Sequence, residues 1–204
     1  MTKKISIIAL FTLFALGLSA QIGVRAGVNV ANQSLRGDLP DFKSSELTGC
    51  QIGLIYQFMP KKTGFGLESG LLFSQRGSGF DYNDELYKGY NEFNYLEVPL
   101  NLRFRLTLGH IGAFVYGGLY GSYLLRAKTV FAGSDTEFSL KLNDFVEHVD
   151  YGYAFGFGVE LLQKLQIGVN WNDGLNDISS IYREEMKITS GKNRMLSVNV
   201  TFLF

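Results

Sequence analysis

Apolar and polar residues alternate one by one along most of eight segments of this chain, and this pattern most limits how the chain can fold. The clearest segment runs from residue 96 to 106, where an unbroken apolar series alternates with Glu97, Asn101 and Arg103, among others. Successive side chains of a strand point to opposite faces, so a period of two predicts strands with one apolar and one polar face. The other segments lie near residues 22–30, 49–58, 65–76, 111–125, 151–161, 165–171 and 196–204.

Residues 111–125 are apolar on both faces and raise the alternative of a transmembrane helix. Fifteen residues rise only about 22 Å as a helix, against a hydrocarbon core of about 30 Å. Four glycines also interrupt this segment. A strand is therefore the better prediction.

Short and long connections alternate between the eight segments. The short ones are residues 59–63, 107–110 and a turn near Gln163. Short periplasmic turns and long external loops are typical of bacterial outer-membrane barrels. We therefore predict an all-β protein with an eight-stranded antiparallel up-and-down transmembrane β-barrel. The long connections, expected to be external loops, span residues 31–47, 77–92, 126–149 and 172–193.

Alternation alone also allows a soluble barrel with its apolar face inside. A soluble barrel would be expected to cover its outside with lysine, glutamate and threonine, but this polar face is largely glycine. Glycine makes up 24 of the 204 residues, and its place on that face suggests a crowded, narrow lumen. Aromatic residues near the strand ends are consistent with girdles at two membrane interfaces. The polar face is therefore expected to point inward.

The first twenty residues indicate export. Lys3 and Lys4 precede an apolar run, and Leu18-Ser19-Ala20 forms a plausible cleavage site. We expect a signal peptide at residues 1–20, with a retained membrane anchor as the alternative, and a barrel domain at residues 21–204. Cleavage leaves 17 basic and 19 acidic residues, a net charge near −2 that offers no case for nucleic-acid binding. Cys50 cannot form an internal disulfide, and we interpret it as a packing residue.

Several charged residues fall on the predicted inward face. Charges in a lumen are costly unless they pair, so we expect an ion-pair network that plugs the barrel, with an ion pathway as the alternative. Our specific hypothesis pairs Glu97 with Arg103 or Arg105, and Glu68 with a neighbouring arginine. Pro99 removes a ladder hydrogen bond and is expected to mark a bulge or kink. The predicted network comprises Arg25, Glu68, Arg76, Glu97, Arg103, Arg105 and Glu160.

No motif predicts catalysis. The two histidines, His110 and His148, fall in a predicted periplasmic turn and an external loop, so they cannot cooperate. His148 with Asp144, Glu147 and Asp150 offers a weak metal cluster, but a solvated loop is the favoured interpretation. Residues 172–177 lack the ligand spacing of a calcium loop. No phosphate loop, zinc spacing or dinucleotide motif is present, so we expect no enzyme activity, metal or cofactor.

Several segments resemble the small outer-membrane β-barrel family of Bacteroidota, often labelled "porin family" and related to PorT. Tyr95-Leu96-Glu97-Val98-Pro99-Leu100-Asn101-Leu102 is similar to its most distinctive motif. The resemblance covers nearly all of the mature chain, but its motifs are fold motifs. Residues 23–30, 66–77, 150–152, 174–178 and 194–204 complete the resemblance.

These patterns predict an integral outer-membrane protein with a structural or interaction role through its external loops. Small-solute or ion passage is the alternative, and the PorT resemblance alone implies a third role, in protein secretion. Phe202 and Phe204 end an apolar strand and resemble the signal that barrel-assembly machinery recognises. The expected partners are outer-membrane lipid, that machinery, and proteins that bind the external loops.

Overall fold

The computed structural model describes residues 20–36, 42–60, 64–82, 88–132, 138–141, 148–176 and 189–204. The predicted signal peptide, up to residue 19, lies outside the described residues. No helix among the described residues is long and apolar enough to cross a membrane. The strands are β1 (Ala20–Arg36), β2 (Phe42–Phe58), β3 (Phe65–Tyr82), β4 (Lys88–Leu108), β5 (Ile111–Ala132), β6 (Phe138–Lys141), β7 (Val149–Leu161), β8 (Leu165–Gly174) and β9 (Thr189–Leu203).

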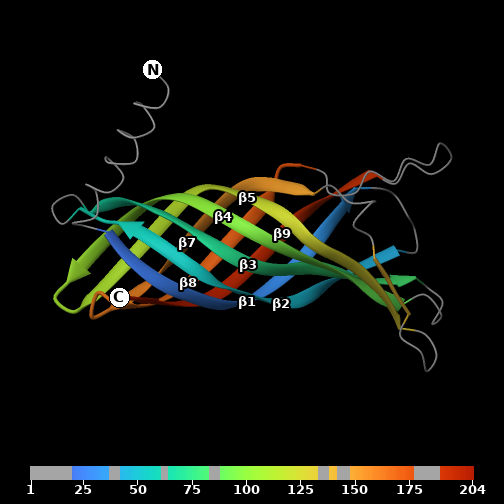
Figure 1. The fold of residues 1–204 in the computed structure, drawn as a ribbon, viewed down its shortest axis with the longest axis horizontal. Helices are drawn as coiled ribbons and strands as arrows, with labels where there is room; N and C mark the ends of the chain where they lie inside the picture. Colours follow the sequence, from blue (N-terminus) through green and yellow to red (C-terminus); the bar gives the residue numbers. More distant parts are fainter. Residues whose placement is uncertain are drawn as a thin grey trace, which may run out of the picture.

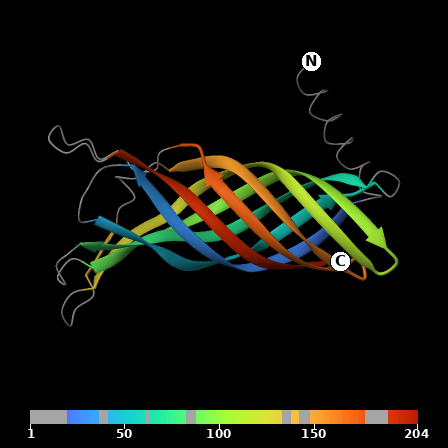
Figure 2. The ribbon, with the colours of Figure 1, turned by 180° about the vertical axis from the view of Figure 1, so that it is seen from behind.

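Eight of these strands close into an antiparallel barrel, which confirms the predicted fold class. The strand order is β4-β3-β2-β1-β9-β8-β7-β5, and β4 also pairs with β5 to complete the circle. Figure 2 shows β9 (red) running between β1 (blue) and β8 (orange). Closure removes the unpaired edges that an open sheet would leave in lipid.

The stagger of the barrel follows directly from the register of its strands. Starting at Val30 in β1, successive partners around the circle return to β1 at Ala20, ten residues away. Such a stagger in a small barrel implies strands tilted by roughly 40° and an interior just wide enough for side chains to fill. The tilt is evident in Figure 1, where the strands cross the long axis obliquely. The partners in between are Leu196, Trp171, Phe155, Gly117, Leu102, Leu67 and Phe58.

The apolar faces point outward and the polar faces inward, as predicted. On β9, exposed Leu196, Val198 and Val200 alternate with buried Ser197 and Asn199. The outward face forms an apolar band with aromatic residues near both ends of the barrel. Toward the end with the longer connections these are Tyr123, Tyr151, Tyr153 and Trp171, and toward the short turns they are Phe65, Phe202 and Phe204.

Strand lengths are where the sequence prediction was wrong. β1 extends to Arg36 and β2 begins at Phe42, so most of the predicted loop at residues 31–47 is paired strand. β3, β4, β5 and β9 likewise extend into predicted loops, and β6 pairs with β5 inside the predicted 126–149 connection. The polar composition of these extensions hid the strands, because it interrupts the alternation of apolar and polar residues from which the strands were predicted.

Pro99 differs from expectation. The β3–β4 ladder lacks partners between Ser69↔Leu100 and Leu72↔Glu97, but the register is the same on both sides. Pro99 therefore interrupts the ladder without the predicted bulge, since it lacks an amide hydrogen. Cys50 lies exposed on the outward face of β2, in the same apolar series as Ile52 and Leu54.

The final residues of β9 complete the closing ladders at the short-turn end of the barrel, so deleting Thr201–Phe204 should impair folding. Thr201 and Phe202 pair with both β1 and β8, and Leu203 pairs with β1, so the deletion shortens both ladders that β9 makes. Refolding of the purified chain in detergent, followed by heat-modifiable electrophoretic mobility, measures this. A deletion of Phe204 alone removes one terminal hydrogen bond, to the Ile22 oxygen at 2.9 Å, and should still fold. Normal folding of the four-residue deletion would contradict the importance of this closure.

Candidate functional site

The candidate site is the barrel interior, where charged side chains from opposite walls meet. Arg25, Glu68 and Arg103 lie toward the short turns, and Arg76 and Glu97 lie toward the longer connections. All five side chains are almost completely buried. Arg105 and Glu160, the other predicted members, lie close to the short turns.

Glu68 is the centre of the cluster nearer the short turns. Its Oε2 accepts hydrogen bonds from Arg25 Nη2 at 3.0 Å and from Arg103 Nη1 at 2.5 Å. Gln57 Nε2 donates to the same oxygen at 2.8 Å, and Arg25 Nε also donates to Thr201 Oγ1 at 2.9 Å. The cluster therefore links four strands across the lumen, β1, β2, β3 and β4, and attaches the end of β9 to them.

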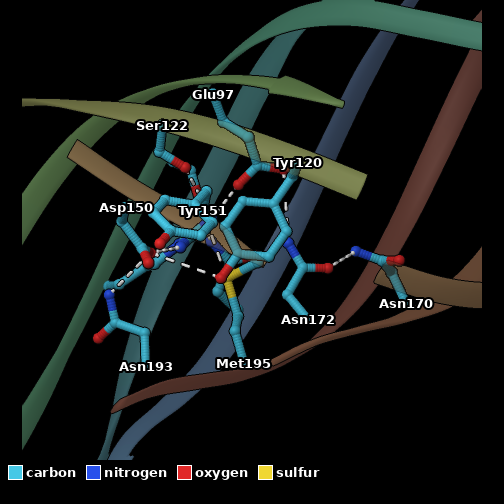
Figure 3. A network of polar contacts seen from close by, with 12 residues as sticks. Glu97, Tyr120, Ser122, Asp150, Tyr151, Asn170, Asn172, Asn193 and Met195 are labelled. Atoms are coloured by element: carbon cyan, nitrogen blue, oxygen red, sulfur yellow. Dashed lines mark hydrogen bonds and ion pairs between the residues drawn. The ribbon is translucent and has the colours of Figure 1, made fainter. Parts of the chain in front are cut away.

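Arg76 is the centre of the second cluster, part of which Figure 3 shows. Its Nη1 donates to Asp150 Oδ2 at 2.7 Å, and its Nη2 donates to Glu97 Oε2. Asn193 Nδ2 also donates to Asp150 Oδ2, at 3.1 Å, so this carboxylate connects β3, β7 and β9. Figure 3 shows the side chains of Glu97, Asp150 and Asn193 converging from separate strands.

A chain of uncharged groups leads from the second cluster toward the first. Tyr116 OH donates to Asn170 Oδ1 at 3.1 Å, and Asn170 Nδ2 donates to Asn172 Oδ1 at 2.6 Å. Asn172 Nδ2 in turn lies 3.5 Å from Glu97 Oε1. At its other end, the Tyr116 ring centroid lies 5.7 Å from the guanidinium carbon of Arg103, so the two clusters are joined there by a ring contact.

A third pair lies nearest the short turns. Arg105 Nη1 is 3.0 Å from Glu160 Oε1, and Gln166 Nε2 donates to Glu160 Oε2 at 2.6 Å. Gln166 also exchanges hydrogen bonds with Gln57, which joins this pair to Glu68.

These contacts correct the pairing predicted from sequence. Glu97 pairs with Arg76, which replaces the predicted Arg103 or Arg105. Asp150, which the sequence analysis named with His148 in a weak metal cluster and left out of the lumen network, is a fully buried partner of Arg76. The alternation could have revealed it, since Asp150 shares the inward positions of Gly152, Ala154 and Gly156. With Asp150 included, the described lumen network holds four arginines and four carboxylates, so its formal charge is zero.

Aromatic rings on β5 support the arginines. The Arg103 guanidinium carbon lies 3.6 Å from the Phe114 ring centroid, and that of Arg76 lies 4.9 Å from the Tyr120 centroid. A guanidinium over an aromatic face gains up to about 2 kcal/mol when it is shielded from water. The rings therefore stabilise the positive charges from the side that the carboxylates do not occupy.

Glycines on β7 make room for these rings. A Cβ at Gly158 would lie 2.5 Å from Phe114 Cζ, and one at Gly152 would lie 2.8 Å from Tyr120 Cε1. A Cβ at Gly156 would lie 2.5 Å from the hydroxyl oxygen of Tyr116. These distances confirm that glycine on the polar face reflects crowding. Residues 152–158 of β7 carry no large inward side chain because side chains from β5 already occupy that space.

Apolar side chains lie inside the barrel on either side of the polar network. Phe93, Tyr95, Leu124 and Ala127 form a buried cluster on the inward faces of β4 and β5, toward the longer connections. At the short-turn end, Met59 and Leu203 are also buried. Buried apolar side chains therefore lie at both ends of the charged network.

The predicted metal and catalytic candidates do not come together. His110 lies exposed in the turn between β4 and β5, and His148 is exposed at the opposite end of the barrel, next to β7. Asp144 and Glu147 lie outside the described residues. Among the residues that the structure does describe, no three His, Cys, Asp or Glu side chains form a group that could hold a metal ion.

A closed barrel with an apolar exterior, aromatic girdles and a charged interior defines a transmembrane β-barrel protein. The family comparison agrees, and the chain belongs to the outer membrane protein beta-barrel domain family, whose model matches residues 14–180. This family places the protein in the outer membrane. No curated protein matches the sequence.

Solved structures with a similar fold are also outer-membrane barrels. Ail, the attachment invasion locus protein of Yersinia pestis, has 15% identity and a TM-score of 0.47, covering 91% of this chain and 99% of that chain. OprG from Pseudomonas aeruginosa has 12% identity and a TM-score of 0.48, covering 91% and 96%. The outer membrane enzyme PagL has 10% identity and a TM-score of 0.46, covering 86% and 98%. At these identities and scores, the similarity carries no argument about activity.

Substitution of Gly156 by alanine should destabilise the barrel by about 1–3 kcal/mol, because the added methyl group displaces the Tyr116 ring. Gly121→Ala on β5 is the matched control, since a Cβ there meets nothing within 4 Å. Urea titration with heat-modifiable mobility as the readout compares the free energies of unfolding. Equal stabilities for the two variants would argue against crowding on the β7 wall.

Replacement of Arg76 by alanine should destabilise the protein by about 3–5 kcal/mol, because it leaves Glu97 and Asp150 buried without a cation. Lys128→Ala provides the control. Lys128 pairs with Glu92 at 3.0 Å but is partly exposed, so its loss should change stability by about 1 kcal/mol or less. The same urea titration measures both, and a loss at Arg76 no larger than that at Lys128 would contradict the role assigned to the network.

Proposed function

We propose that this protein is a non-enzymatic outer-membrane barrel whose lumen is plugged by side chains and whose external loops carry a structural or interaction role. The observation that carries the proposal is the neutral network centred on Glu68 and Arg76, which crosses the lumen and has buried apolar side chains at both ends. A plugged lumen leaves the outer surface and the loops as the parts that can meet a partner.

The proposed orientation follows from the lengths of the connections. The short turns between β2 and β3, β4 and β5, and β7 and β8 lie at one end, which we assign to the periplasm. The external connections then follow β1, β3, β5, β6 and β8. Proteins that bind there and outer-membrane lipid are the proposed partners.

Export and assembly complete the proposal. Residues 1–20 act as a cleaved signal peptide, and the apolar end of β9, with Phe202 and Phe204, is recognised by the barrel-assembly machinery. Deletion of Phe204 alone separates recognition from folding, because this variant should refold in detergent yet accumulate poorly in the outer membrane of cells. Equal amounts of folded variant and unaltered protein in cells would argue against recognition.

Within its family, we propose a PorT-like assignment, supported by the Tyr95–Leu102 motif. A role in protein secretion depends on that assignment alone. Normal export of secreted proteins after deletion of the gene would count against it.

Passage of small ions is the second candidate, favoured by the polar side chains that run along the lumen. Planar-bilayer recordings separate the two functions. Purified protein should show no large steady conductance, because buried side chains fill the lumen. Large steady conductance from the unaltered protein would overturn the plug.

A further inference from the structure

Two cations of β9 project from the barrel toward the surrounding membrane. Lys192 and Arg194 are exposed and alternate with buried Asn193 and Met195, so they share the outward face with Leu196. They lie toward the external end of β9, where the strand passes between β1 and β8. Figure 2 shows this part of β9 (red) on the side facing the viewer.

Arg194 is held in place by its neighbours. Its Nε lies 3.5 Å from Asp173 Oδ1 on β8, and Tyr153 OH on β7 donates to Asp173 Oδ2 at 2.9 Å. The Arg194 side chain is nevertheless 55% exposed. Its contact with Asp173 is made through Nε, so the two terminal nitrogens of the guanidinium remain available to an anion.

Apolar and aromatic side chains lie directly beside these cations on the membrane side. Trp171 on β8 pairs across the strands with Leu196, and both are exposed. Arg194, two residues from Leu196 along β9, pairs with Asp173. The surface therefore changes from apolar to cationic within two residues along β9, as expected where hydrocarbon meets headgroups.

The charges favour an anionic occupant. Lys192, Arg194 and Asp173 together carry a formal charge of +1. On the β4–β5 surface, by contrast, Lys128 is neutralised by Glu92. Each basic residue near an anionic membrane surface contributes roughly 1 kcal/mol of attraction.

We propose that Lys192, Arg194, Trp171 and Leu196 form a docking surface for the phosphorylated glycolipid of the outer leaflet, lipid A. The phosphate lies against Lys192 and Arg194, and an acyl chain lies over Trp171 and Leu196. This inference rests on the orientation in the proposed function but not on the plugged lumen. A conducting barrel would overturn the plug and leave the docking surface unaffected.

The test uses the single tryptophan of the chain, Trp171, which lies within the docking surface. Folded protein in non-ionic detergent is titrated with lipid A, with dephosphorylated lipid A and with inorganic phosphate while tryptophan emission is recorded. Lipid A should give a saturable change, dephosphorylated lipid A should bind at least about tenfold more weakly, and inorganic phosphate alone should give no change.

A double variant, Lys192→Gln with Arg194→Gln, should weaken lipid A binding about tenfold while keeping the heat-modifiable mobility of a folded barrel. The matched control is Lys164→Gln, which removes an exposed lysine from the short turn between β7 and β8. This control should bind lipid A as the unaltered protein does. Equal binding of phosphorylated and dephosphorylated lipid, saturation by inorganic phosphate alone, or unaltered affinity of the folded double variant would each overturn the proposal.

Discussion

The need to neutralise buried charge in a narrow barrel shapes the rest of this structure. A stagger of ten residues over eight strands leaves an interior that side chains fill, and in it the described strands place four arginines. An isolated buried ion is destabilising by several kcal/mol, so each arginine requires a carboxylate and further polar contacts. Glu68, Glu97, Asp150 and Glu160 provide those carboxylates.

The need to stabilise the buried arginines also explains the glycines on the inward face of β7. Arg103 and Arg76 lie over aromatic rings of β5, and those rings occupy the space in front of β7. Only glycine fits at Gly152, Gly156 and Gly158, where a Cβ would meet those rings, while Ala154 is accommodated between them in sequence. A high glycine content, which in isolation would suggest flexibility, here permits dense packing of rings and guanidinium groups.

Contact with lipid determines the side chains on the outer surface. Lipid accepts apolar side chains on all strands, and polar atoms become favourable only at the two interfaces. The ion pair of Arg194 and Asp173 lies on the outward face beyond Trp171, so it indicates where the apolar band ends on that side. The interior network accounts for the proposed closure of the lumen, while the outward cations and external connections provide the proposed sites of contact.

The sequence by itself separated the two faces of most strands, because side-chain alternation is a local property of an extended backbone, and the glycine-rich polar face indicated that the apolar face meets lipid. It also identified seven members of the charged network from their inward positions. Only the tertiary structure decided that Glu97 pairs with Arg76, that Asp150 joins them, and that the strands extend into the predicted loops. These features depend on closure, since the stagger and tilt of the whole barrel set which inward side chains meet across the lumen. No single strand contains that information.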